Sequence, residues 1–271
     1  MLWLGGSLGR FLMTWVIGLA SMFGYSAALS DIQVSWPGGQ TLDCLQKLYP
    51  IAPFMIAGFS GSVELGFSLI GDLHAWLRPQ IPTGGTVNTR MAVQLWWRRA
   101  RWIFSRGRAE LKKYGTQLLI AGISPGERRG DLWPRTEVIV LSSSSGFVPR
   151  YASPMAPVSI GSGSAIPEYV ATLQNLDYLL SAEGSFLGGF AAGIGLHASL
   201  ALWSTPKPGV SSYLHLGLAR LGEAKVMPLL QSRPGPNGLS VNDPMPAIAS
   251  SWEEFKRLAQ GKGLRASTAS A

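Results

Sequence analysis

The first third of the chain has the hydrophobic pattern of paired strands followed by a helix. Runs rich in β-branched, aromatic and small residues, separated by turn residues, predict strands over residues 14–21, 25–35, 45–51 and 54–59. Apolar residues then recur at close to helical spacing over residues 62–77, and a proline follows. Four strands therefore precede the first predicted helix.

A second predicted helix, over residues 91–114, has an apolar and a basic face. The apolar positions are Val93, Trp96, Ala100, Ile103 and Leu111. The polar positions are Arg98, Arg101, Ser105, Arg108 and Lys112. Two interpretations fit this pattern. The basic face is solvated above a buried apolar face, or the tryptophans and arginines of residues 96–102 together bind a charged partner.

The middle of the chain repeats the order of strands followed by a helix pair. Strands are predicted over residues 117–123, 137–141 and 157–160, with a polar insertion at 126–131. Helices follow over 166–181 and 186–203, and two strands over 210–220 and 224–230 close the pattern. Strand runs that alternate with helix pairs predict a layered α+β fold rather than successive βαβ units.

The remaining residues differ in composition. Residues 231–247 are rich in Pro, Gly, Asn and Ser and are interpreted as a linker. Ser251 and Glu254 match a capping box that predicts a short helix ending near Ala259. Residues 261–271 are predicted to be disordered.

Composition narrows the class of protein. The chain has 271 residues, of which 46% are hydrophobic and 14% charged, well below the average of about 25% charged. This argues against a disordered chain, and the apolar excess favours surface that is buried in an assembly or near a membrane. The net charge of +8 favours acidic partners in general. A single cysteine, Cys44, excludes an intrachain disulfide framework and is compatible with a reducing compartment.

Signatures of cofactor sites are missing from the sequence. Three scattered histidines and one cysteine form no Cys/His metal cluster, and no strand is followed by a glycine-rich dinucleotide or phosphate-loop motif. Neither a metal nor an organic cofactor is therefore implied.

The first 30 residues have two interpretations. One arginine, an apolar stretch and small residues near Ala28 resemble a secretory signal peptide. The alternative is the pair of strands described above. A second methionine, Met13, precedes Thr14, so translation from Met13 followed by removal of that methionine would leave Thr14 as the N-terminal residue. Residues 1–13 would then be an incorrectly assigned start or a propeptide.

Three segments resemble, in the same order, segments of proteasome β subunits and HslV-like proteases. They read TWVIGLASMFGYSAALSD at residues 14–31, KLYPIAPFMIAGFSGS at 47–62 and PVSIGSGSAIPEYVATL at 157–173. With its Met-Thr start, the chain is similar in particular to bacterial ancestral-β-subunit proteasome homologues. The resemblance implies an N-terminal nucleophile hydrolase, folded as a four-layer αββα sandwich over residues 14–230 and assembled into a homo-oligomeric ring.

The resemblance assigns roles to five residues. Thr14 would supply the hydroxyl nucleophile and, in its own α-amine, the base. Lys47 would favour the developing alkoxide by its charge, and Asp31 would pair with Lys47. The backbone N–H of Gly61 would donate to the oxyanion. Ser162 would contact the α-amine.

The sequence also departs from the family pattern. The interval from Thr14 to Asp31 is one residue longer than usual, which requires a bulge or a longer turn, or places Ser30 at the acidic position. The family's later Asp and Ser are not visible, and only Ser211 or Ser212 could substitute for that serine. Met13 stands where self-processing relatives have glycine, which favours a choice of start codon over self-cleavage.

The predicted function is a threonine peptidase that cleaves polypeptides in the cytoplasm. Neither a nucleic acid nor a membrane is an expected partner, and the sequence specifies no unfoldase. Two alternatives remain. One is a catalytically inactive structural subunit of the same fold, and the other is a secreted, periplasmic or membrane-tethered binding protein with a signal peptide over residues 1–30.

Overall fold

The computed structural model describes most of the chain outside one long internal segment. The described residues are 14–21, 24–81, 88–129, 133–153, 156–161, 211, 213–220, 222–229, 232–235, 238–241 and 246–271. Residues 1–13, the candidate site residue Ser162, Ser212 and the helices predicted over 166–181 and 186–203 lie outside them.

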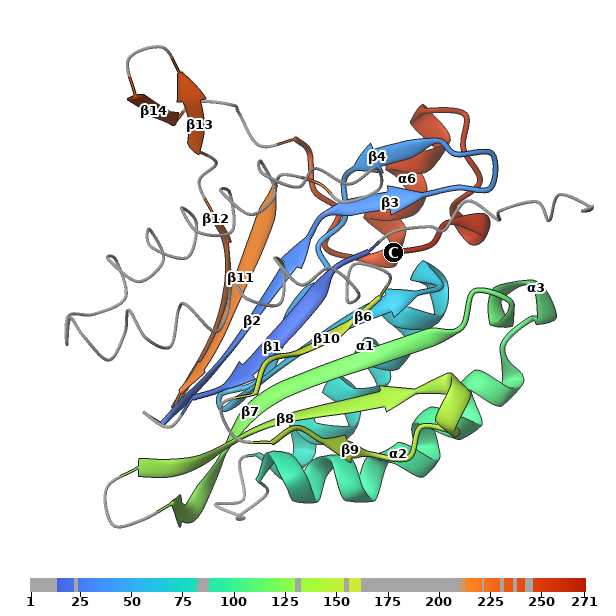
Figure 1. The fold of residues 1–271 in the computed structure, drawn as a ribbon. Helices are drawn as coiled ribbons and strands as arrows, with labels where there is room; N and C mark the ends of the chain where they lie inside the picture. The colour runs from blue at the N-terminus through green and yellow to red at the C-terminus, as the bar shows by residue number, and fades with distance from the viewer. Residues whose placement is uncertain are drawn as a thin grey trace, which may run out of the picture.

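The fold is mixed α/β, and two five-stranded antiparallel sheets form its centre (Figure 1). The first, called the β1 sheet, has the strand order β10-β1-β2-β11-β12. Its strands are β10 (Val158–Ile160), β1 (Val16–Ala20), β2 (Tyr25–Asp31), β11 (Leu214–Arg220) and β12 (Glu223–Leu229). The second, called the β7 sheet, has the order β5-β6-β7-β8-β9. Its strands are β5 (Leu48–Ala52), β6 (Met55–Gly61), β7 (Thr116–Arg129), β8 (Trp133–Ser142) and β9 (Arg150–Tyr151).

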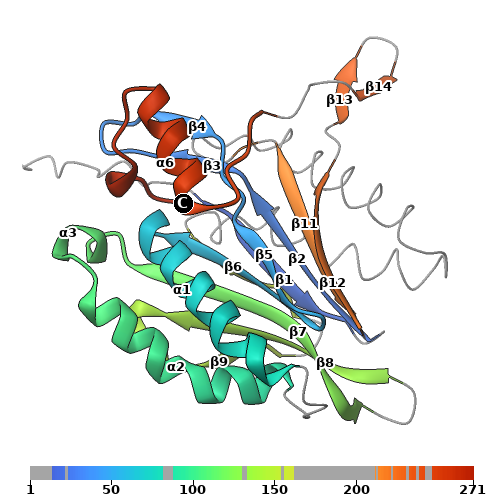
Figure 2. The same cartoon turned by 180° about the vertical axis from the view of Figure 1, so that it is seen from behind.

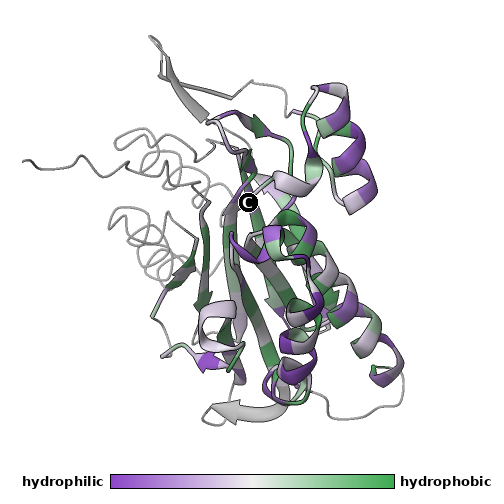
Figure 3. Ribbon diagram, turned by 90° about the vertical axis from the view of Figure 1, so that its right-hand side faces the viewer, coloured by the Kyte–Doolittle hydropathy of each residue, from purple (hydrophilic) through white to green (hydrophobic). Residues whose placement is uncertain are grey.

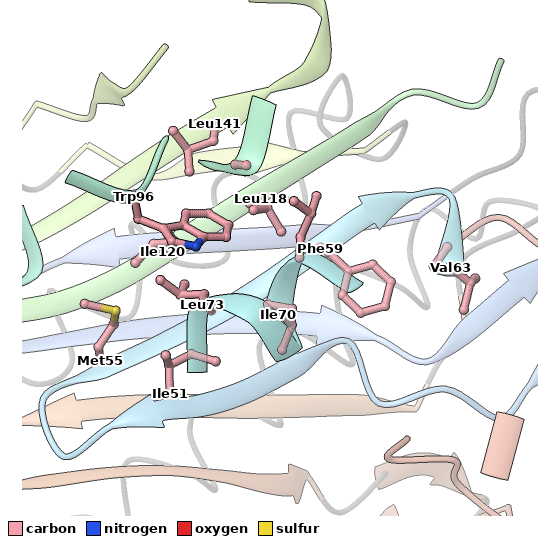
Figure 4. Close-up of a cluster of buried hydrophobic side chains, with 14 of the residues drawn as sticks. Ile51, Met55, Phe59, Val63, Ile70, Leu73, Trp96, Leu118, Ile120 and Leu141 are labelled. Carbon is pink, nitrogen blue, oxygen red and sulfur yellow. The ribbon is translucent and has the colours of Figure 1, made fainter. Parts of the chain in front are cut away.

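Two helices, α1 (Val63–Leu77) and α2 (Thr89–Arg106), cover one face of the β7 sheet (Figure 2). Each begins at a side-chain cap: Ser62 accepts from the N–H of Leu65, and Asn88 from that of Met91. Short helical segments follow each of them, η1 (Arg78–Gln80) after α1 and α3 (Ala109–Lys112) after α2. Apolar side chains from both helices and the sheet fill the space between them, as Figure 4 shows for Leu73, Trp96 and Ile120.

The opposite face of the β7 sheet packs against the β1 sheet. Val16 and Ala28 from the β1 sheet belong to one buried cluster with Ile56, Leu119 and Val138 from the β7 sheet. Figure 3 shows hydrophobic residues along the strands of both sheets, whereas the helices alternate between hydrophobic and hydrophilic residues. The described chain thus forms three layers: helices, β7 sheet and β1 sheet.

The far face of the β1 sheet is also covered. Ile17, Leu29 and Leu216 are cross-strand neighbours on that face, and all three are fully buried. They alternate along their strands with residues that face the β7 sheet, as expected of a sheet covered on both sides.

A smaller group of elements lies at one end of the sheets. It contains the hairpin of β3 (Gln33–Ser35) and β4 (Thr41–Asp43), the helix α6 (Trp252–Gly261) and the short turn η4 (Ala266–Thr268) (Figure 1). The ring of Trp36, beside β3, stacks on Phe255 of α6 with a centroid distance of 6.0 Å. The indole N–H of Trp36 donates to the backbone oxygen of Arg265 at 2.9 Å.

Most of the predicted strands and helices that fall on described residues are present, but several begin or end at other residues than predicted. The strand predicted over 25–35 divides at Ile32, whose oxygen accepts two N–H groups from residues 44 and 45. The helix predicted over 91–114 breaks at Gly107, a poor helix former in extended conformation. The polar residues 126–129, predicted as part of an insertion, belong to β7, and a 3-10 turn, η2 (Ser143–Ser145), follows β8.

Two predictions for the later residues were wrong. The segment interpreted as a linker contains the hairpin of β13 (Ser232–Gly235) and β14 (Gly238–Val241), because Pro and Gly mark hairpin ends as well as linkers. Residues 261–271, predicted to be disordered, are ordered by contacts with the rest of the fold. Gly261 ends α6, Ser270 pairs with Ser35, and Ala269 and Ala271 are buried in the main hydrophobic cluster. The capping box is confirmed: the Ser251 side chain accepts from the N–H of Glu254 at the start of α6.

The structure confirms that the apolar face of the basic helix α2 packs against the core. Val93, Trp96 and Ala100 of α2 are fully buried. The Trp96 indole donates to Asp72 of α1 at 2.9 Å, and Arg99 forms two hydrogen bonds with the same carboxylate. None of the helices in the described part of the chain is both long and apolar enough to cross a membrane.

Candidate active site

Thr14, Lys47 and Asp31 meet where three strands begin or end. Thr14 precedes β1, Asp31 ends β2 and Lys47 precedes β5. The Lys47 ammonium lies 2.8 Å from Asp31 Oδ1 and 3.4 Å from Thr14 Oγ1. Lys47 and Asp31 are fully buried, and Thr14 is 3% exposed. Residues far apart in the sequence thus form one continuous polar chain.

The Asp31 carboxylate is held on both oxygens. Oδ1 accepts from the N–H of Trp15 at 3.0 Å, besides the Lys47 ammonium. Oδ2 accepts from the N–H of Gln33 at 3.1 Å and from that of Ser211 at 3.4 Å. These bonds compensate the carboxylate for the water that it loses on burial and fix its orientation toward Lys47.

Burial sets the protonation behaviour of this ion pair. Loss of solvent lowers the pKa of Lys47, while the Asp31 carboxylate 2.8 Å away acts in the opposite direction. Burial likewise raises the pKa of Asp31, opposed by the charge of Lys47 and by backbone N–H groups. A buried lysine of this kind can donate a hydrogen bond to a hydroxyl and stabilise negative charge that develops on its oxygen.

The glycine segment after β10 lies directly against Thr14. β10 pairs with β1, and Gly161 follows it with a φ of +83°. A Cβ atom at Gly161 would lie 2.5 Å from the Thr14 carbonyl oxygen, so a larger residue does not fit. The structure therefore brings residue 161 of the PVSIGSG segment to Thr14. Ser162, assigned to the α-amine by resemblance, lies outside the described residues.

Gly61 ends β6 with a φ of +93°, and a Cβ atom there would lie 2.5 Å from the oxygen of Gly115. Its N–H, assigned to the oxyanion by resemblance, donates to the backbone oxygen of Ala271. The N–H of Ala271 in turn donates to the Gly61 oxygen at 2.7 Å. The N–H that the resemblance assigns to the oxyanion is therefore already bonded to the backbone of residue 271.

The longer interval between Thr14 and Asp31 is accommodated outside the paired strands. β1 and β2 pair without a register shift from Val16 opposite Ser30 to Ala20 opposite Ser26. Asp31, not Ser30, contacts Lys47. Of the two serines considered as substitutes for the family's serine, Ser211 reaches the site through its N–H, while its Oγ accepts from the N–H of Tyr213 at 3.0 Å.

Two features of the site were not predicted from the sequence. His215 of β11 is buried, and burial followed by the charge of Lys47 lowers its pKa to about 4. Residues 269–271 were the other omission, since Ala-Ser-Ala has no periodic pattern. Among the described residues, no group of three or more His, Cys, Asp or Glu side chains could hold a metal ion.

No protein-family model matches the chain, and no curated protein matches it significantly.

Proposed function

We propose that the protein is a threonine peptidase of the N-terminal nucleophile type. The observation that carries this proposal is the buried chain from Thr14 through Lys47 to Asp31, with distances of 3.4 Å and 2.8 Å. Isolated buried charges are costly, so an ion pair directed at a hydroxyl in the interior calls for a chemical role.

The proposed fold is the four-layer αββα sandwich. Support comes from the three layers of the described chain, in the order helices, β7 sheet and β1 sheet. Further support comes from Ile17, Leu29 and Leu216, which are buried on the far face of the β1 sheet. The helices that the sequence predicts over 166–181 and 186–203 would supply the covering layer.

The proposed reaction has two steps. The Thr14 oxygen attacks the scissile carbonyl carbon while its proton passes to the Thr14 α-amine, directly or through water. Lys47 stabilises the alkoxide, and the Gly61 N–H stabilises the tetrahedral oxyanion. Collapse expels the amine, which takes the proton, and leaves an ester on Thr14. Water then hydrolyses this ester by the same route in reverse.

This mechanism requires Thr14 to carry a free α-amine. Removal of residues 1–13, by translation from Met13 and loss of that methionine, would provide it. An α-amine titrates near pH 7.7 to 8.0 in model peptides and is thus partly neutral at cellular pH. The signal-peptide alternative is less compatible with the fold, because cleavage near Ala28 would remove β1 and half of β2 from the centre of a sheet.

We further propose a cytoplasmic homo-oligomeric ring that acts on polypeptides. Exposed apolar side chains on α2 support an assembly surface: Met91, Leu95 and Trp102 are all more than 40% exposed. Arg106 lies over the Trp102 ring at 3.9 Å, so this surface is both basic and aromatic.

The test is hydrolysis of a panel of fluorogenic peptides by protein that begins at Thr14. Thr14→Ala should abolish hydrolysis without a change in the thermal unfolding midpoint. Thr14→Ser, which keeps a hydroxyl and an α-amine, is the matched control and should retain measurable activity. Undiminished hydrolysis by a clean Thr14→Ala preparation would refute the proposal.

The second candidate function is an inactive structural subunit of the same fold. It is favoured by the residues that fill the site: Ala271 bonds to Gly61, and the segment 205–212 around Ser211 has no acidic residue. An electrophilic peptide probe that reacts with the amino alcohol of an N-terminal threonine separates the two. The inactive subunit remains unlabelled under conditions in which a peptidase is labelled.

A further inference from the structure

Residues 269–271 form an extended segment between Ser35 of β3 and Gly61, the residue that the resemblance assigns to the oxyanion. On one side, Ser270 exchanges two hydrogen bonds with Ser35 of β3, at 2.9 and 3.0 Å. On the other side, Ala271 exchanges two with Gly61, and the oxygen of Ala269 accepts from the N–H of Val63 at 3.3 Å. Both bridges, Ser35 to Ser270 and Ser62 to Ser270, are antiparallel. Addition of a strand in this way is a common mode of peptide binding.

The side chains of this strand are fully enclosed. Ala269 and Ala271 are 1% and 2% exposed, and Ser270 is 7% exposed. The Ser270 hydroxyl also donates to the Gly61 oxygen at 3.2 Å. A peptide that pairs with Ser35 and Gly61 would need the same backbone groups and the same space.

The strand is anchored by packed elements rather than by its own three residues. α6 contributes the buried Phe255 and Ala259 to the main core, and Phe255 stacks on Trp36 next to β3. The Trp36 indole holds the Arg265 oxygen just before η4. This anchor keeps residues 269–271 at high effective concentration beside Ser35 and Gly61.

We propose that residues 269–271, as an internal peptide, occupy the backbone positions that a substrate would take between Ser35 and Gly61, and thereby inhibit the proposed peptidase. The inference rests on the proposed function, and the bound strand defines its regulation. A substrate has to displace this strand from Ser35 and Gly61 before its carbonyl can reach Thr14. Because Ala269 and Ala271 are enclosed, the site between Ser35 and Gly61 should favour peptides with small side chains at these two positions.

The test uses full-length Ser270→Pro protein that begins at Thr14. Proline removes the N–H that donates to Ser35 and should release the strand. The matched control is Ala266→Pro, which introduces the same residue at the first position of η4. Arg265 before it is extended, as a residue that precedes proline prefers. Ala269→Trp is a second releasing variant, because an indole cannot fit at a position 1% exposed.

Three readouts are combined. The binding of a fluorescent peptide with the sequence of residues 266–271 is measured by anisotropy, and backbone exchange at Ser35 and Gly61 by hydrogen–deuterium exchange. Hydrolysis of fluorogenic peptides is measured in parallel. We expect Ser270→Pro and Ala269→Trp to bind the peptide and to hydrolyse substrates at least tenfold better than the wild type, with faster exchange at both amides. Ala266→Pro should match the wild type.

The outcomes distinguish the two proposals. Equal peptide binding by wild type and both releasing variants, with exchange faster in the variants, would overturn the internal-peptide proposal. Tighter peptide binding by the releasing variants without any hydrolysis would support the internal peptide and contradict the peptidase. Equal hydrolysis by all four proteins would support the peptidase and contradict inhibition by residues 269–271.

Discussion

The core between the β7 sheet and its helices is built from apolar side chains such as Leu73 and Ile120 (Figure 4). The junction beside Thr14, by contrast, buries a lysine and an aspartate completely. Removal of apolar area from water accounts for the first region, at roughly 25 cal/mol per Å². The second region gains little free energy from the burial of apolar area. Each ion loses its hydration, and the mutual attraction of the pair must first offset that loss.

The first region therefore stabilises the fold, whereas the second has a composition that stability does not require. Well-packed hydrophobic residues in place of a buried ion pair are often neutral or stabilising. Stability alone therefore does not account for Lys47 and Asp31, but a function that needs a cation beside the Thr14 hydroxyl does. Substitutions in the two regions should consequently differ in how they affect stability and activity.

The largest effect is expected from Lys47→Met. The variant leaves the Asp31 carboxylate buried without its cation and should lower the free energy of unfolding by about 3 to 5 kcal/mol. It should also reduce peptide hydrolysis by roughly 100-fold or more, because the charge beside the Thr14 oxygen is lost. Urea denaturation and initial rates measure the two effects.

The double variant Asp31→Asn, Lys47→Met serves as the control for stability. With both charges removed, most of the lost free energy of unfolding should return while hydrolysis stays absent. Recovery of hydrolysis together with stability would mean that the ion pair has only a structural role.

Leu73→Ala should have the next largest effect and should affect stability alone. Leu73 is fully buried, so its truncation leaves a cavity and should cost about 3 kcal/mol. The activity of the folded fraction should not change. Val148→Ala, at a position 52% exposed and away from the proposed assembly surface, is the matched control and should change stability by less than about 0.5 kcal/mol.

Acid should destabilise the protein through His215, which belongs to the polar junction. Its pKa falls from 6.5 to about 4 on folding, so the unfolded chain takes up a proton that the folded chain does not. Above pH 6.5, His215 is neutral in both states and does not favour unfolding. As the pH falls from 6.5 toward 4, protonation in the unfolded chain alone lowers the free energy of unfolding. Between pH 7 and pH 5 the loss should be about 2 kcal/mol.

Thermal unfolding of the wild type and His215→Gln at both pH values measures this contribution. Glutamine does not titrate in this range, so the variant should lose about 2 kcal/mol less than the wild type between pH 7 and pH 5. An identical pH dependence of the two proteins would contradict the assignment.

The smallest effect is expected from the surface pair of Arg108 and Glu64, whose closest atoms are 2.6 Å apart. The Arg108 side chain is 61% exposed, so solvent screens the pair. Arg108→Ala should change the free energy of unfolding by less than about 1 kcal/mol at 25 °C. A loss comparable to that of Lys47→Met would show that burial is not what distinguishes the two ion pairs.

Local signals predicted much of the described fold. Ser251 is a helix cap at the position that its capping box indicates, and apolar spacing predicted α1. Resemblance to proteasome β subunits selected Asp31 and Lys47 from the chain's charged residues, and the structure brings them to Thr14. The pairing register of β1 and β2 was needed to decide between Ser30 and Asp31.

Other features could not be predicted because they depend on contacts between distant residues. Ala-Ser-Ala at residues 269–271 has no periodicity, and its position depends on backbone groups of Ser35 and Gly61. The depressed pKa of His215 arises from burial under the whole fold and from the charge of Lys47. The hairpin of β3 and β4, by contrast, has a local signal in the Pro-Gly-Gly sequence at residues 37–39.

The most direct test of the central claim is the intact mass of the protein after treatment with the electrophilic probe for an N-terminal threonine. Wild type and Ser270→Pro are treated, with Thr14→Ala as the unreactive control. The account predicts a chain that begins at Thr14 and carries one probe adduct, formed faster in Ser270→Pro and absent in Thr14→Ala. A chain that begins at Thr14 and stays unmodified in Ser270→Pro would contradict it.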